Sequence, residues 1–103
     1  MEIAFKTQLL ADLYQNKKVS EKQYKSNPNL VKSYIKTVNK LKSATKIEQL
    51  LQITSLNYEH LSGDRHGLCS VRINDQYRLI FEEIKENEEI NVLLLEEISK
   101  HYE

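Results

Sequence analysis

The 103-residue sequence predicts one α+β domain, in which N-terminal helices pack on one face of a small, mainly antiparallel sheet. Two patterns of apolar residues predict this class. In the first half, apolar residues recur every three or four positions, which indicates amphipathic helices. After Thr54, apolar and polar residues alternate, which indicates strands. Because a chain of this length closes around one core, we expect residues 1–103 to form a single domain.

The chain is expected to open with a short strand, in which Ile3 and Phe5 alternate with polar or small neighbours. Thr7 can then cap a first helix, because its side-chain oxygen can accept a hydrogen bond from a backbone N–H of the first turn. The apolar side of this helix consists of Leu9, Leu10 and Leu13.

The longest helix is predicted to begin at Asn27-Pro28, since Asn is favoured as an N-cap and Pro at the first helical position. Its apolar side consists of Leu30, Val31, Tyr34, Ile35, Val38 and Leu41. Thr45 and Glu48 have the spacing of a capping box, which predicts a shorter helix after them. The apolar residues of this shorter helix are Ile47, Leu50 and Leu51.

The net charge of zero conceals a division along the chain. Residues 1–46 carry ten lysines and three acids, whereas residues 47–103 carry five basic and twelve acidic residues. Three of the lysines, Lys32, Lys36 and Lys40, are four positions apart and therefore form one stripe on the long helix. Two interpretations stay open, because such a stripe either binds a polyanion or is a solvated helix face.

Several classes of protein are excluded by composition. The longest apolar run, Val92–Leu95, is too short to span a bilayer as a helix. It belongs to a segment, Ile90–Leu95, that predicts a central strand covered on both faces. The N-terminus does not resemble a secretory signal, and the single cysteine, Cys69, excludes an internal disulfide. We therefore expect a cytoplasmic protein that is not associated with a membrane.

Two alternating segments, 69–73 and 77–81, predict a hairpin. Because the helices need a single apolar sheet face, Val71 must lie opposite Leu79, and Ile73 opposite Tyr77. This register makes Tyr77 a core residue. The loop residues are Asn74, Asp75 and Gln76, and we expect positive φ angles there because Asn and Asp tolerate them.

The same register places Arg72 opposite Arg78, on the sheet face away from the helices. Two facing guanidinium groups repel unless an anion lies between them, and phosphate fits the planar arginine fork well. The alternative is that Glu82 or another carboxylate bridges the pair. The loop before the hairpin contains two glycines and can bring Arg65 and His66 toward the same face.

The segment Leu61–Phe81 resembles the signature block of HigB-type toxins in the RelE/ParE superfamily, which reads approximately L-x-G-D-R-x-G-x-x-S-V-R-I-N-x-Q-Y/W-R-L-x-F. The resemblance implies a RelE/ParE-like fold and the toxin of a type II toxin–antitoxin pair. It further implies a ribosome-dependent, metal-free endoribonuclease that cleaves mRNA and inhibits translation. The expected partners are the ribosome, mRNA and a HigA-like helix-turn-helix antitoxin, with operator DNA bound only through the antitoxin.

The resemblance also assigns roles to residues. Arg65, Arg72 and Arg78 match the arginines that bind and neutralise the scissile phosphate. The family often ends in an Asp-Tyr-His-like group, whereas this chain ends in His101-Tyr102-Glu103. We therefore expect Arg72, Arg78, His101 and Tyr102 to be catalytic, since histidine and tyrosine can transfer protons. The expected substrate-binding residues are Arg65, His66, Lys32, Lys36 and Lys40.

No cofactor is expected. His60, His66 and Cys69 have a spacing that matches no closed four-ligand zinc pattern, so no metal site is predicted and Cys69 is interpreted as a small buried residue. Two other functions stay open. One is a gyrase inhibitor without nuclease activity, as in the ParE branch, and the other is a non-catalytic module whose arginine face binds an acidic protein.

Overall fold

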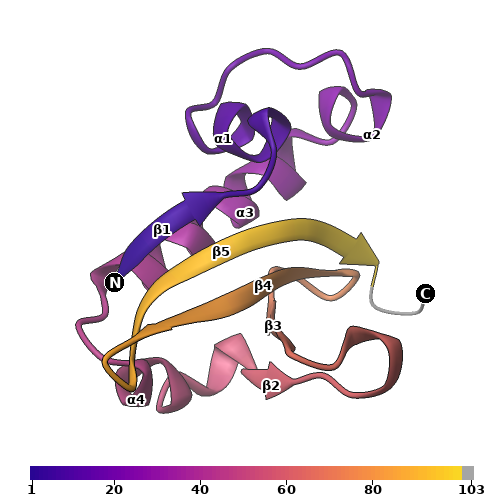
Figure 1. Cartoon of the computed structure of the whole chain (residues 1–103). Coiled ribbons are helices and arrows are strands. Elements are labelled where there is room, and N and C mark those ends of the chain that lie inside the picture. The colour runs from indigo at the N-terminus through magenta and orange to yellow at the C-terminus, as the bar shows by residue number, and fades with distance from the viewer. Residues whose placement is uncertain (101–103) are drawn as a thin grey trace.

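The computed structural model describes residues 1–100, so the predicted catalytic residues His101 and Tyr102 lie outside the described part of the chain. Helices and strands follow one another as predicted for an α+β domain (Figure 1). In chain order they are β1 (Glu2–Phe5), α1 (Gln8–Tyr14), α2 (Lys22–Lys25), α3 (Pro28–Ser43), α4 (Ile47–Leu51), η1 (Thr54–Leu56), β2 (Glu59–His60), η2 (Gly63–Arg65), β3 (Leu68–Arg72), β4 (Tyr77–Glu86) and β5 (Glu89–Lys100), where η denotes a 3-10 helix.

The five strands form one sheet in the order β1-β5-β4-β3-β2. Only β1 is parallel to its neighbour β5, and the other neighbouring pairs are antiparallel, which confirms a mainly antiparallel sheet. Helices α1 and α3 lie against the β1–β5 side of the sheet (Figure 1). None of the helices in residues 1–100 is long and apolar enough to cross a membrane.

The register predicted for the hairpin is confirmed. Val71 lies opposite Leu79 and Arg72 opposite Arg78, and beyond the strand ends the N–H of Ile73 donates to the carbonyl of Tyr77 at 3.0 Å. The expectation of positive φ angles in the loop is wrong. The Asn74 side chain closes the turn instead, because its Oδ1 accepts hydrogen bonds from the backbone N–H groups of Gln76 and Tyr77, at 2.9 Å each.

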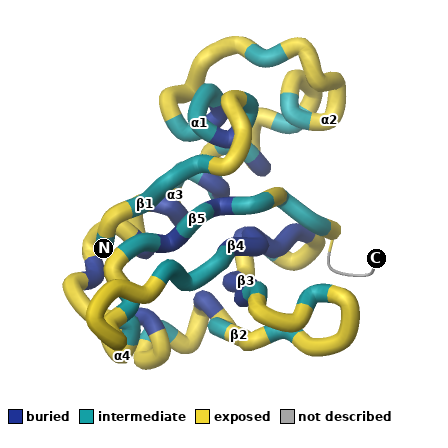
Figure 2. The backbone as a smooth tube through the Cα atoms, viewed as in Figure 1, coloured by how far each residue is buried: buried dark blue, intermediate teal, exposed yellow. Residues whose placement is uncertain are grey.

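The hydrophobic core lies between one face of the sheet and the helices. The helices contribute Leu10, Leu13, Leu30, Tyr34, Val38 and Leu41, and the sheet contributes Cys69, Val71, Tyr77, Leu79, Phe81, Leu93 and Leu95. Ile73, which follows directly after β3, also belongs to the core. Within the sheet, Figure 2 shows the buried residues gathered on β3, β4 and the middle of β5. The predictions that Tyr77 and Cys69 are buried are confirmed, and burial raises the pKa of the Cys69 thiol to about 12.

Two of the three predicted helix starts are confirmed by their caps. Thr7 Oγ1 accepts from Leu10 N at 3.2 Å, and Asn27 Oδ1 accepts from Leu30 N at 3.3 Å. The capping box at Thr45 is wrong, because Lys46 occupies the N-cap position of α4 and makes no side-chain cap. The Gln49 side chain instead reaches back to Thr45 N at 2.8 Å, one residue later than the box requires.

The last strand is longer and less covered than predicted. β5 runs for 12 residues, and only Leu93 and Leu95 are buried, whereas Val92 and Leu94 are partly exposed. The expectation of cover on both faces is therefore wrong, because all helices with buried residues pack on the same face as Leu93. Helix α2, strand β2 and the 3-10 turns were not predicted, since each spans four residues or fewer and leaves no periodic pattern.

Candidate functional site

A cavity of about 310 Å³ opens beside the sheet face that points away from the core. Arg65 and Arg78 both contribute to its wall, which confirms that the fold brings these two predicted residues together. The complete lining is Glu59, Leu61, Ser62, Arg65, Arg78, Ile80, Ser99 and Lys100. Strand β4 supplies two of these residues, residues 59–65 supply four, and the end of β5 supplies the other two.

Arg78 is held rigidly at the base of this cavity, with a side chain only 10% exposed. Its Nε donates to Ser70 Oγ at 2.9 Å, and its Nη2 donates to the Asn57 carbonyl at 2.7 Å. Asn57 presents that carbonyl from a left-handed backbone conformation at the end of η1. Glu59 Oε2 lies 3.8 Å from Arg78 Nη2 and provides the nearest negative charge.

Arg72 lies across from Arg78 in the register but has a different environment. Its side chain is 42% exposed and forms an ion pair with Asp75, which is itself 91% exposed. Arg72 does not line the cavity. The cross-strand repulsion expected for this pair is thus offset by two separate carboxylates, one for each arginine. The alternative of a bridging Glu82 is not what the structure shows, since Glu82 lies opposite Leu68 at the other end of β3.

Arg65 reaches the cavity from the short turn η2, which is bounded by two glycines with positive φ angles, Gly63 at 67° and Gly67 at 93°. These angles favour glycine and let the chain fold back over the sheet. Arg65 Nη2 lies 3.0 Å from Glu97 Oε1, and both side chains are about half exposed. An ion pair this exposed contributes little to stability, so Arg65 can exchange its carboxylate partner for another anion at low cost.

Other predicted site residues lie elsewhere. His66 is exposed and does not line the cavity. Lys32, Lys36 and Lys40 are exposed on α3, on the side opposite the buried Tyr34, and therefore lie across the helical layer from the arginine cavity. The structure thus separates the predicted substrate-binding residues into two surfaces.

Two charged residues of the cavity were missed by sequence reasoning. Glu59 lies on β2, which has only two residues and gives no periodic signal. Lys100 ends β5, beyond the apolar segment Ile90–Leu95. The register shifts between Leu95 and Glu97, so Ile98 and not Glu97 shares the core face with Leu95 and lies opposite Leu79. A strict period of two from Leu95 would turn Ser99 toward the core, whereas the shifted register places it opposite Arg78 and at the cavity wall.

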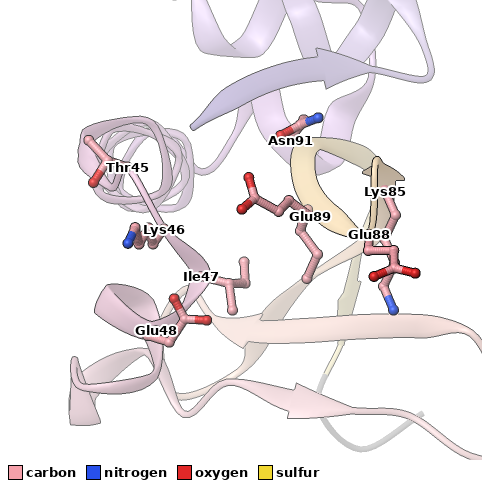
Figure 3. Close-up of a pocket in the computed structure, with 9 residues that line it drawn as sticks. Thr45, Lys46, Ile47, Glu48, Lys85, Glu88, Glu89 and Asn91 are labelled. Atoms are coloured by element: carbon pink, nitrogen blue, oxygen red, sulfur yellow. The ribbon is translucent and has the colours of Figure 1, made fainter.

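A second cavity of about 380 Å³ lies at the opposite end of β4, between α4 and the β4–β5 turn (Figure 3). Its wall mixes charges of both signs, with Lys46 and Lys85 beside Glu48, Glu88 and Glu89. None of the residues predicted to be functional lines it. We therefore regard the arginine cavity as the candidate site.

Comparisons with known proteins identify the family. A family model described as the RelE-like toxin of type II toxin–antitoxin system HigB matches residues 3–97. Toxin HigB-1 from Vibrio cholerae serotype O1 is 32% identical over 83 residues, which cover 80% of this chain and 83% of that protein.

Two solved structures share the fold. The YoeB/ParE toxin from Agrobacterium tumefaciens superposes with a TM-score of 0.56 at 20% identity, covering 99% of this chain and 100% of that one. YafQ from E. coli strain BL21(DE3) superposes with a TM-score of 0.54 at 13% identity, covering 98% and 93%. With the family match over nearly its whole length, this chain belongs to the HigB-like toxins, the RelE-like toxins of type II toxin–antitoxin systems.

Proposed function

We propose that this toxin cleaves mRNA on the ribosome without a metal and thereby inhibits translation. The observation that supports this proposal is the arginine cavity, in which two guanidinium groups and a carboxylate surround a space of about 310 Å³. Metal-free cleavage needs fixed positive charge at the scissile phosphate, a base for the 2′-hydroxyl and an acid for the leaving oxygen. The cavity has the first of these and a candidate for the second.

Arg78 provides the fixed charge. Its hydrogen bonds to Ser70 and Asn57 leave the Nη1 group without a partner among residues 1–100, and an arginine has five donors in a planar fork. A phosphate in the cavity can accept from this group while the rest of the side chain stays in place. Such preorganised donors cost no rearrangement when charge develops on the phosphate in the transition state.

Arg65 and Arg72 provide positive charge on exposed side chains that can change their ion-pair partners. Both are 42% exposed, and each has an exposed carboxylate partner that an incoming phosphate can replace. In this mechanism Arg65 closes over the phosphate from the η2 turn, and Arg72 contacts the neighbouring stretch of RNA. Arginine suits both roles because it stays charged at every physiological pH.

Proton transfer is assigned to a carboxylate and to the C-terminal pair. Glu59 lies on the cavity wall, 3.8 Å from the Arg78 guanidinium, and can accept the 2′-hydroxyl proton from there. His101 and Tyr102 follow directly on Lys100, which lines the same cavity. We assign the protonation of the leaving 5′-oxygen to this pair, with His66 as the second candidate.

The family implies an antitoxin partner, and we propose a HigA-like helix-turn-helix protein that alone contacts operator DNA. The surface proposed for the ribosome or for an acidic antitoxin segment is the stripe of Lys32, Lys36 and Lys40, because it is exposed and uniformly positive. On this proposal the toxin acts in the cytoplasm, where ribosomes and mRNA are found.

The test uses purified toxin, translating ribosomes and a short mRNA, with cleavage mapped by primer extension. Arg65→Gln should reduce the single-turnover cleavage rate by about 100-fold, the usual cost of one transition-state donor. Lys85→Gln is the matched control, since it removes an exposed positive charge at the far end of the sheet. A wild-type toxin that leaves mRNA intact but blocks DNA supercoiling by gyrase would overturn the proposal.

A further inference from the structure

A second group of reactive side chains gathers on the core side of the sheet, away from the arginine cavity. His60, Cys69 and Glu83 come together there, and one ligand atom from each lies within 4.8 Å of the other two. Tyr58 completes the group by donating a hydrogen bond from its hydroxyl to Glu83 Oε2 at 2.5 Å. The other carboxylate oxygen, Oε1, lies 3.3 Å from His60 Nε2.

Strand register explains why these residues meet although they are up to 23 positions apart in sequence. His60 on β2 lies directly opposite Cys69 on β3, and Cys69 lies opposite Phe81 on β4. Glu83 is two positions beyond Phe81 and therefore points to the same side of the sheet. Three adjacent strands thus each contribute one side chain to the same spot, at the spacing that cross-strand partners normally have.

The donor atoms of this group suit a transition metal. Thiolate sulfur, imidazole nitrogen and carboxylate oxygen are the three protein ligands of zinc, at about 2.0–2.3 Å from the ion. On binding, the Cys69 thiol loses its proton to solvent, and the thiolate and the Glu83 carboxylate then carry two negative charges, which balance a divalent cation. The ligand atoms must close from at most 4.8 Å to about 3.3–3.8 Å, the separation in a tetrahedral zinc site, which is within the reach of side-chain rotations.

The surroundings also match those of a metal site. The hydrogen bond from Tyr58 orients the Glu83 carboxylate and leaves Oε1 directed at His60, as outer-shell partners of metal ligands commonly do. Cys69 is 1% exposed, whereas the His60 side chain is 68% exposed, so an ion can enter from solvent and still reach a dry sulfur. We propose that His60, Cys69 and Glu83 bind a divalent transition metal, with zinc preferred, which fastens the edge strand β2 to β3 and β4.

The experiment titrates zinc chloride into tag-free, chelator-treated toxin and follows binding by calorimetry and stability by thermal unfolding. We expect one zinc per chain and a Tm that rises with zinc concentration, because binding to the folded state alone stabilises it. Cobalt(II) in place of zinc should give a sulfur-to-metal charge-transfer absorption, which reports on Cys69 directly.

Variants then assign the ligands. His60→Gln and Glu83→Gln should each weaken zinc binding at least tenfold, and Tyr58→Phe by about 10–100-fold as an outer-shell change. His66→Gln is the matched control, since it removes another exposed histidine six positions away and should bind zinc normally. Cys69→Ser should abolish the cobalt absorption.

The outcomes are decisive in both directions. His60→Gln keeps its fold because the side chain is mostly exposed, so a loss of zinc binding in this variant cannot arise from unfolding. Unchanged zinc affinity in His60→Gln, an absence of cobalt–sulfur absorption in the wild type, or equal losses in His66→Gln would each overturn the site.

Discussion

Replacing each arginine of the cross-strand pair by glutamine should give two very different losses of stability. Arg72 and Arg78 are opposite one another in the same hairpin, so a sequence view treats them alike. In the structure Arg78 is 10% exposed and Arg72 is 42% exposed. The prediction concerns the free energy of unfolding of Arg78→Gln and Arg72→Gln, measured without ligand.

The magnitude for Arg78→Gln follows from its two short hydrogen bonds. A hydrogen bond that involves a charged group contributes about 1.5–3 kcal/mol, and an orphaned buried acceptor costs a similar amount. Glutamine is too short to reach both Ser70 Oγ and the Asn57 carbonyl, so at least one of these contacts is lost. We expect a loss of about 2–4 kcal/mol, partly reduced because the repulsion between the two arginines also disappears.

Arg72→Gln removes only an exposed ion pair with Asp75, so its unfolding free energy should change by less than about 0.5 kcal/mol. For a domain of this size, the Tm of Arg78→Gln should fall by about 10–20 °C and that of Arg72→Gln by at most a few degrees. Thermal and urea unfolding followed by circular dichroism measure both. Equal losses for the two variants, or a more stable Arg78→Gln protein, would refute the structural reasoning.

Three further predictions test the tail, the helix surface and the core. Deletion of residues 101–103 should abolish mRNA cleavage while the far-ultraviolet circular dichroism spectrum stays unchanged. Full activity of the shortened toxin would mean that His66 and Glu59, and not the C-terminal pair, transfer the protons. Changing Lys32, Lys36 and Lys40 together to Glu should leave the Tm within a few degrees but reduce the amount of toxin that sediments with ribosomes, most strongly at low salt. Binding that is unchanged across a salt series would show that these lysines form only a solvated helix face. Burial raises the pKa of the fully buried Tyr34 above its ordinary value of 10.0. The unfolding free energy should therefore decline as the pH rises above about 10, because only the unfolded state loses the proton there. Urea unfolding at a series of pH values should show a weaker decline for Tyr34→Phe than for the wild type.

The fold class, most of the long elements and the hairpin register could be predicted from the sequence alone. These are local or periodic properties: Asn27-Pro28 starts a helix through its own side chain and ring, and Val71 and Leu79 must share a face because the period of a strand is two. The register in turn fixed that Arg72 and Arg78 face one another. That inference required only the alternation of apolar residues and one buried face.

The surroundings of each arginine could not be predicted, because they come from the packing of segments that are distant in sequence. The carbonyl of Asn57 and the carboxylate of Glu59 reach Arg78 from a segment about 20 positions away, and strand β2 is too short to have a pattern of its own. The same two-residue strand turns Glu59 toward the arginine cavity and His60 toward Cys69 and Glu83. Contacts of this kind depend on how distant segments pack, because their energy comes from burial and pairing between segments, on which local sequence periodicity has no bearing.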